Sequence, residues 1–152
     1  MINVAFVKLD PRATLPVAGT SDAVGFDLFT LESVIVAPRG TARLRTGIAY
    51  ARKPGFHDAD LLSLYLVEAQ IRARSSAFGK WGVIIPNAPG TVDPDYTGEF
   101  LIQVVNLRDT EILIPEQSRV AQVVFSIVPR ILITEEKEQK FAANRGGFGS
   151  TG

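Results

Sequence analysis

The sequence predicts an all-β domain, either a sandwich or a barrel, and two observations support this. Short runs rich in valine, isoleucine and leucine recur along the chain, separated by turns that contain proline and glycine. Helix signals are nearly absent, and the charged segment 134–140 is expected to be a single helical turn or a linker. With 152 residues, the chain is long enough for one domain with a buried core.

Composition excludes several classes of function. Sixteen basic and sixteen acidic residues cancel, so neither direct nucleic-acid binding nor attraction to an anionic membrane is indicated. The absence of cysteine excludes disulfides, thiolate metal sites and cysteine nucleophiles. No run approaches the roughly 20 apolar residues of a membrane span, and the first residues lack the layout of a secretory signal. We therefore expect a cytoplasmic protein, or one inside a host cell if the source is viral.

The first part of the chain predicts two strands joined by a loop. Residues 2–8 are β-rich, and the loop 16–21 contains proline and glycine. The next run, 23–29, is apolar but includes Gly25 and Asp27. Both residues are unusual inside a simple buried strand, so Asp27 is either a solvated carboxylate at a strand end or part of a site.

The middle of the chain continues the pattern of strands and turns. Strands are expected over 33–37 and 42–50, followed by a surface loop over 52–60. A long strand is expected over 61–73, with Leu62, Leu64 and Leu66 on one face. The same alternation brings Arg72 and Arg74 to that side at the end of the strand.

A loop rich in functional side chains follows. The apolar runs 80–86 and 100–105 flank the segment 87–100, which we expect to be a β-hairpin that holds Asp93, Asp95 and a tyrosine at the rim of a sheet. Loops on a rigid scaffold are favoured places for function. A turn over 111–116 and a strand over 118–129 complete the expected elements.

Three further segments have the composition of anion-binding sites. Arg74, Ser75 and Ser76 combine a guanidinium fork with two hydroxyls, which suits a phosphate group, although an ordinary polar turn explains them equally well. Gln122 lies in mid-strand, as a satisfied core glutamine or as a ligand. The glycine-rich tail 144–152 is either a disordered end or a segment that wraps an anion.

Together, these segments resemble the five motifs of the trimeric dUTPase family (deoxyuridine triphosphate nucleotidohydrolases). In this sequence they occupy 23–28, 72–76, 90–99, 119–123 and 145–152, in the family's order. The resemblance implies a distorted β-barrel or jelly roll over 1–143, a flexible C-terminal lid over 144–152, and a homotrimer with shared active sites.

The family cleaves dUTP to dUMP and pyrophosphate, which limits uracil incorporation into DNA and supplies dUMP. The resemblance implies that Asp93 activates the water that attacks the α-phosphorus. It also implies that Tyr96 packs on the deoxyribose. Asn87 and the backbone of Thr91 and Val92 would then bind the uracil edge.

The same resemblance assigns the triphosphate and its ion. Asp27 would hold Mg²⁺ through water, with an all-oxygen shell of the kind this ion prefers. The phosphate groups would be bound by Arg74, Ser75, Ser76 and Gln122. In the tail, the expected substrate-binding residues are Arg145, Phe148, Gly149, Ser150 and Thr151, with Phe148 stacked over uracil.

The sequence departs from the family pattern at Ala73, where proline is usual, at Thr97, where arginine is common, and in a shorter spacing between Arg145 and Phe148. Two alternatives stay open. One is a regulatory protein on the same scaffold in which hydrolysis is secondary. The other is a related dCTP deaminase.

Overall fold

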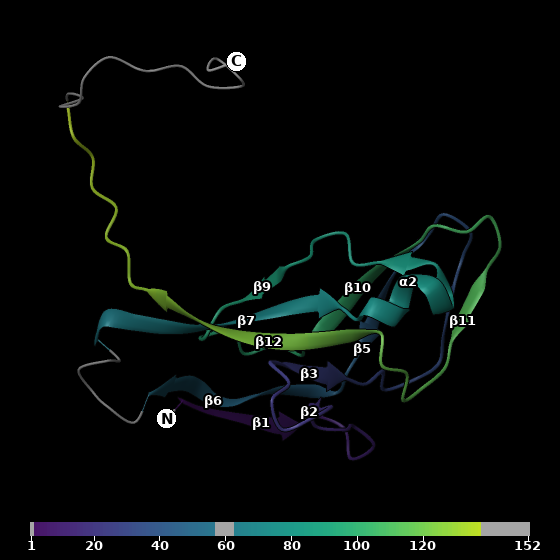
Figure 1. The fold of residues 1–152 in the computed structure, drawn as a ribbon, viewed down its shortest axis with the longest axis horizontal. Helices are drawn as coiled ribbons and strands as arrows, with labels where there is room; N and C mark the ends of the chain where they lie inside the picture. Colours follow the sequence, from purple (N-terminus) through teal and green to yellow (C-terminus); the bar gives the residue numbers. More distant parts are fainter. Residues whose placement is uncertain (1, 57–62, 138–152) are drawn as a thin grey trace.

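A computed structural model describes residues 2–56 and 63–137, and the all-β class predicted from the sequence is confirmed (Figure 1). One short helix that lies wholly within the described residues, α2, accompanies the strands. The first strands are β1 (Ile2–Lys8), β2 (Val17–Ala18), β3 (Gly25–Leu28), β4 (Val34–Val36), β5 (Thr41–Arg45) and β6 (Ile48–Phe56). They are followed by β7 (Tyr65–Ala73), α2 (Ser75–Trp81), β8 (Val83–Ile84), β9 (Gly90–Val92), β10 (Leu101–Asn106), β11 (Ile112–Ile114) and β12 (Ala121–Pro129).

The described strands pair antiparallel in four sheets. The largest has the order β2-β3-β12-β7-β9, and the others are β5-β10-β8, β1-β6 and β11-β4. Strands β7 and β12 lie side by side through the middle of the molecule, where Tyr65 pairs with Pro129 and Ala73 with Ala121 (Figure 1). This long pair is the scaffold from which the site residues extend.

The core is formed by alternate residues of the strands. In β10, Ile102, Val104 and Asn106 are buried while Leu101 and Gln103 are exposed, as a period of two requires. Each fully buried aliphatic side chain contributes about 1.5–3 kcal/mol. The amide of buried Asn106 donates hydrogen bonds to three main-chain carbonyls, those of Val36, Ala37 and Thr110, which satisfies its polar group.

The run 42–50, expected as one strand, is two. Strand β5 ends at Arg45 and β6 begins at Ile48, because Gly47 adopts a φ of 70° that turns the chain. A Cβ atom on Gly47 would lie 2.8 Å from Cβ of Ala13, so only glycine fits. The prediction of a loop over 52–60 is wrong for its described part, 52–56, because β6 continues to Phe56 and pairs there with β1.

Helix α2 replaces the first part of the strand expected over 80–86. The helix forms because Ala77 and Trp81 bury themselves in the core, and it ends at Gly82, whose N–H donates to the Phe78 carbonyl at a φ of 70°. Tertiary packing thus overrides weak local helix signals. Of the two alternatives for 134–140, a helical turn or a linker, the described part 134–137 shows no helix and fits the linker.

Two other expected boundaries are corrected. The strand expected over 61–73 begins at Tyr65, with Ser63 and Leu64 in helical conformation. Within 111–116, expected as a turn, β11 pairs with β4 and buries Ile112 and Ile114. Two residues of the expected loop 16–21 also pair, as β2.

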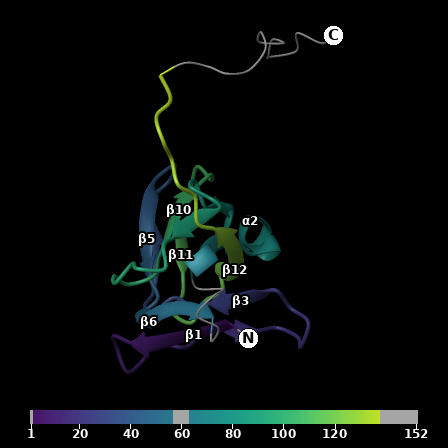
Figure 2. The ribbon, with the colours of Figure 1, turned by 90° about the vertical axis from the view of Figure 1, so that its left-hand side faces the viewer.

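After β12 the chain leaves the body of the fold, as both views show (Figures 1 and 2). Its apolar residues Ile131, Leu132 and Ile133 are 74%, 87% and 89% exposed. Three consecutive aliphatic side chains in water are unfavourable, so this exposure is unusual for a segment of a single chain.

Candidate active site

The segment 87–100 is more than the hairpin expected from the sequence. Its flanking strands β8 and β10 do pair, through Val105 and Ile84. Between them, however, β9 leaves this sheet and pairs with β7, Gly90 opposite Ile71 and Val92 opposite Ala69. The loop therefore bridges two sheets, which opens a space between β9 and β10.

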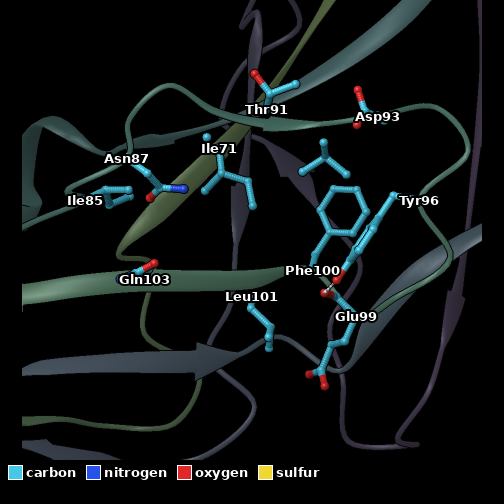
Figure 3. Close-up of a pocket in the computed structure, with 12 residues that line it drawn as sticks. Ile71, Ile85, Asn87, Thr91, Asp93, Tyr96, Glu99, Phe100, Leu101 and Gln103 are labelled. Carbon is cyan, nitrogen blue, oxygen red and sulfur yellow. Dashed lines mark hydrogen bonds between the residues drawn. The ribbon is translucent and has the colours of Figure 1, made fainter.

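That space is a cavity of about 270 Å³. It brings together the five residues predicted to bind the base and sugar and to activate water, namely Asn87, Thr91, Val92, Asp93 and Tyr96. The rest of its lining comes from Ile71, Ile85, Gly90, Glu99, Phe100, Leu101 and Gln103. Figure 3 shows Asn87 toward one end of the cavity and Asp93 with Tyr96 toward the other.

The Asn87 side chain is placed by the apolar residues and by a glycine. Ile71 and Ile85 form the wall beside it (Figure 3). A Cβ on Gly90 would lie 3.0 Å from Nδ2 of Asn87, so the glycine leaves room for the amide. No described protein group hydrogen-bonds this amide. An amide with a free donor and a free acceptor is suited to a ligand edge that carries both.

Asp93 lies at the rim with its carboxylate exposed. Its main-chain carbonyl accepts from the Tyr96 N–H at 3.1 Å, which fixes the turn, while its carboxylate has no partner in the described chain. Asp95 is likewise exposed but does not line the cavity. Of the two carboxylates, Asp93 is thus the one able to hold a water molecule inside the site.

Tyr96 closes the same end of the cavity. Its hydroxyl donates to the main-chain carbonyl of Glu99 at 3.2 Å, and its ring lies against Gly98, where a Cβ would meet the hydroxyl oxygen at 2.4 Å. The ring stands beside Phe100 (Figure 3) and is 43% exposed. A half-exposed ring fixed at its hydroxyl end can serve as a wall for a ligand.

A second polar region lies where β3, β12 and β7 meet. Asp27 is buried; its Oδ1 forms an ion pair with Arg74, 2.7 Å from Nε, and its Oδ2 accepts from Arg119 Nη1 at 3.3 Å. We call Asp27, Arg74 and Arg119 the arginine cluster. Two positive charges against one negative leave a net positive charge, so the cluster can still attract an anion.

The position of the Gln122 side chain accounts for the glycine at position 25. Gln122 pairs with Asp27 and with Arg72 on neighbouring strands, and its amide donates to the Ala73 carbonyl at 3.3 Å. A Cβ on Gly25 would lie 2.0 Å from the Gln122 amide oxygen. The glycine that is unusual in this apolar run therefore makes space for the Gln122 side chain beside the cluster.

Ser75 and Ser76 begin α2 directly after Arg74, and both are exposed. The ordinary polar turn expected as their alternative is a helix start. Because the helix was not expected from the sequence, the sequence alone did not define the setting of these two serines.

A row of polar side chains on β7 was missed in the sequence. Thr91 donates to Glu68 at 2.9 Å, Gln70 donates to Glu68 at 2.9 Å, and Arg72 donates to Gln70. Alternate polar residues at 68, 70 and 72 are the signal that could have revealed it. The row connects the cavity loop to the strand end that carries Arg74.

The cavity and the arginine cluster are separate in the single chain. None of the predicted phosphate-binding residues Arg74, Ser75, Ser76 and Gln122 lines the cavity, and neither does Asp27. The predicted tail residues Arg145, Phe148, Gly149, Ser150 and Thr151 lie outside the described residues.

The described residues do not provide a direct metal site. No group of three or more histidine, aspartate or glutamate side chains gathers among them. The carboxylate of Asp27 is engaged by two guanidinium groups. This donor set fits an ion that arrives with a ligand and meets the protein through water, not one held by the protein itself.

A buried tyrosine supports the cavity floor. Tyr50 packs edge-on against Phe100, with ring centroids 4.9 Å apart, and its hydroxyl has no partner in the described structure. Burial raises the pKa of Tyr50 far above its ordinary value, so the hydroxyl stays protonated at neutral pH. Within the described residues, no helix has the length and apolar character needed to cross a membrane.

Comparisons with known proteins point to one family. A family model described as dUTPase matches residues 11–152. The deoxyuridine 5'-triphosphate nucleotidohydrolase of Hydrogenobaculum sp. is 40% identical over 147 residues, covering 95% of this chain and 94% of the relative. The protein with the same name from Wolinella succinogenes is 37% identical over 155 residues, covering 99% and 95%.

Solved structures share the fold. The Staphylococcus bacteriophage 80alpha dUTPase with dUPNHPP superimposes with a TM-score of 0.78 at 20% identity, covering 100% of this chain and 98% of that one. The D95N mutant of the dUTPase from phage phi11 of S. aureus, a structure that reveals the coordination of a structural Mg(II) ion in that protein, gives a TM-score of 0.71 at 18% identity, covering 93% of this chain and 99% of that one.

Proposed function

This chain belongs to the dUTPase family, and from that premise we propose how it acts as a dUTP diphosphatase, which hydrolyses dUTP to dUMP and pyrophosphate. The observation that carries the proposal is the cavity itself. In one space of about 270 Å³ it combines an unpaired amide, an unpaired carboxylate and an aromatic wall. Family membership favours hydrolysis over the deaminase and regulatory alternatives.

We assign base recognition to Asn87 and to the main chain of Thr91 and Val92. The uracil edge carries one N–H between two carbonyls, and a free amide beside a β-strand edge can match that pattern. The cytosine edge differs in its donors and acceptors, so it would leave buried polar groups unpaired. Such a mismatch costs about 1–3 kcal/mol for each group.

In the proposed reaction Asp93 orients a water molecule and accepts its proton as the water attacks the α-phosphorus. Pyrophosphate is the leaving group, and dUMP keeps the α-phosphate. General-base catalysis of this kind contributes about 10²–10⁴-fold. Tyr96 packs against the deoxyribose, and its position next to Asp93 fits a sugar bound at that end of the cavity.

The triphosphate is assigned to Arg74, Ser75, Ser76 and Gln122. Guanidinium forks bind phosphate oxygens in pairs, and the net positive charge of the arginine cluster supplies the attraction. We take Mg²⁺ as part of the substrate, chelated by the triphosphate and met by Asp27 through water. Neutralising phosphate charge is the chemistry that the ion supplies.

We further propose a homotrimer with shared active sites. One chain holds its nucleoside cavity apart from its phosphate-binding residues, and it leaves Ile131, Leu132 and Ile133 exposed. Both features support an assembly in which a second copy of the chain completes the site. The segment 144–152 is proposed as a lid that closes on bound nucleotide. Light scattering of the purified protein tests the assembly, and a monomer would contradict it. A cytoplasmic location stays a prediction.

Asp93→Asn tests the chemical step, with Asp95→Asn as a matched control two residues away. We expect kcat for pyrophosphate release from dUTP to fall about 10²–10⁴-fold in Asp93→Asn. The affinity for a non-hydrolysable dUTP analogue should change less than about threefold, because the amide keeps the shape of the side chain. Asp95→Asn should leave both quantities nearly unchanged. Equal losses in the two variants would remove Asp93 from the base role.

A further inference from the structure

Glu99 lines the nucleoside cavity, but its carboxylate points away from Asp93 (Figure 3). One carboxylate oxygen accepts from the main-chain N–H of Gly47 at 2.7 Å. The other accepts from Nε of Arg45 at 3.1 Å. The Glu99 side chain is only 16% exposed. Both oxygens are therefore engaged in a partly buried setting, where charge-assisted hydrogen bonds are strong.

The turn that Glu99 binds is itself fixed on several sides. The Gly47 carbonyl accepts from the Leu9 N–H at 2.7 Å. The Thr46 hydroxyl donates to the Phe100 carbonyl at 2.6 Å, and the Phe100 N–H donates to the Ile48 carbonyl at 2.9 Å. Since Gly47 also fits tightly against Ala13, the turn between β5 and β6 is a rigid anchor.

On its other side, Glu99 holds the aromatic wall of the cavity. Its main-chain carbonyl accepts the Tyr96 hydroxyl at 3.2 Å, and Gly98 leaves the space in which this ring lies. Tyr96 is 43% exposed, so packing alone does not fix its ring. The contact with Glu99 is the described hydrogen bond of the Tyr96 side chain.

We propose that Glu99 is a positioning residue that fixes the Tyr96 ring through the turn 45–47 and thereby sets the selectivity for 2′-deoxynucleotides over ribonucleotides. The inference rests on the proposed function, in which Tyr96 faces the sugar. A wall excludes an added hydroxyl only if it cannot retreat. When the Glu99 side chain no longer binds the turn 45–47, the end of the loop 87–100 moves. The Tyr96 ring can then shift and leave space for a 2′-hydroxyl.

The test compares Glu99→Gln with the native protein, using dUTP and UTP. Glutamine keeps the shape of the side chain, but an NH₂ group replaces one of the two acceptor oxygens, so it faces either the Gly47 N–H or the Arg45 guanidinium and one of the two bonds is lost. We expect the ratio of kcat/KM for dUTP over UTP to fall about tenfold, mainly through faster UTP hydrolysis. The kcat for dUTP should stay within about threefold.

Asp109→Asn is the matched control, because it breaks another pair between arginine and a carboxylate, with Arg39 at 2.7 Å and remote from the cavity. It should leave the ratio unchanged. If Glu99→Gln lowers Tm while the ratio stays at the native value, Glu99 is only structural and the inference fails.

A double-mutant cycle locates the effect. Tyr96→Phe removes the hydroxyl that reaches Glu99, so Glu99→Gln in that background should cause no additional loss of selectivity. Independent, additive losses overturn the coupling through Tyr96. If Glu99→Gln does not fold, Arg45→Met weakens the same anchor from its exposed side. It should lower the ratio in the same direction, and an unchanged ratio overturns the inference.

Affinities for the α,β-imido analogues of dUTP and UTP separate this inference from the proposed function. They measure sugar selectivity without hydrolysis. If the native protein releases no pyrophosphate from dUTP, the proposed function fails, while the affinity ratio of the Glu99 variant still decides the positioning role. If the native affinity ratio is near one, no sugar wall exists and the inference fails with it.

Discussion

The cavity between β9 and β10 and the arginine cluster are both polar regions at the ends of strands, yet they differ in whether key polar side chains have a partner. In the cavity, the Asn87 amide and the Asp93 carboxylate have no partner in the described chain. In the cluster, Asp27 is buried between Arg74 and Arg119. The cavity therefore presents these two unpaired groups to a ligand, whereas the charged groups of the cluster are paired with each other.

This difference separates two ways of preparing a site. Free groups on a rigid wall need no rearrangement, so they are suited to selecting a base and a sugar. Opposite charges that pair with each other lower the free-energy cost of burying them in the folded protein. A phosphate, however, must then compete with Asp27 for Arg74. We therefore expect the cavity to determine the selectivity for base and sugar. We expect the cluster to determine how much stability is exchanged for anion binding.

The largest expected effect concerns the separation of the two regions. Asp93→Asn damages the cavity and Arg74→Ala damages the cluster, so each variant alone should lose about 10²–10⁴-fold in kcat. If a site uses the cavity of one chain and the cluster of another, unfolding and refolding an equal mixture should restore about a quarter of the native activity. Refolding each variant alone is the control. No recovery in assemblies shown to be mixed would place both regions of a site on one chain.

A smaller effect is expected from the cavity alone. Asn87→Ala should lower kcat/KM for dUTP about 10–100-fold, because two hydrogen bonds to the base are lost. The free energy of unfolding, measured with urea, should change by less than about 0.5 kcal/mol, since the amide has no protein partner. Gln103→Ala, which alters another cavity residue with no assigned role, is the control. A large loss of stability in Asn87→Ala would contradict the statement that the Asn87 amide has no protein partner.

The smallest effect is expected from the cluster. Asp27→Asn should lower the free energy of unfolding by about 1–2 kcal/mol, because two partly exposed guanidinium groups lose their counter-charge. In buffer without Mg²⁺, inorganic tripolyphosphate should raise the Tm of this variant more than that of the native protein, since Asp27 no longer competes for Arg74. Asp10→Asn, in an exposed pair with Arg12, is the control. A weaker response to tripolyphosphate would show that Asp27 assists anion binding.

The motifs and their order could be predicted from the sequence, because each motif contains residue types that core packing alone does not explain. Gly25 and Gln122 illustrate both the success and the limit. Each is unusual in its own strand, and the sequence marks each as unusual. Only the pairing of β3 with β12 reveals that the glycine makes space for the glutamine. A contact between distant strands depends on register, which a single sequence does not encode locally.

Helix α2 was missed for a related reason. Ser75–Trp81 has no acidic residue in its first turn and contains Gly79, so its local helix signal is weak. It is a helix because Ala77 and Trp81 pack into the core. Burial of two side chains outweighs the local preference.

The sequence by itself determined the all-β class and the family, because alternation and motif composition are local properties of the chain. Tertiary structure decided how the loop 87–100 is used. From its sequence it is a hairpin between β8 and β10, but β9 pairs with β7 instead and so opens the cavity. Tertiary structure also set Asp27 between two arginines and left the Asn87 amide and the Asp93 carboxylate without a partner among the described residues. These outcomes depend on which strands become neighbours, and that is fixed only when the whole core is packed.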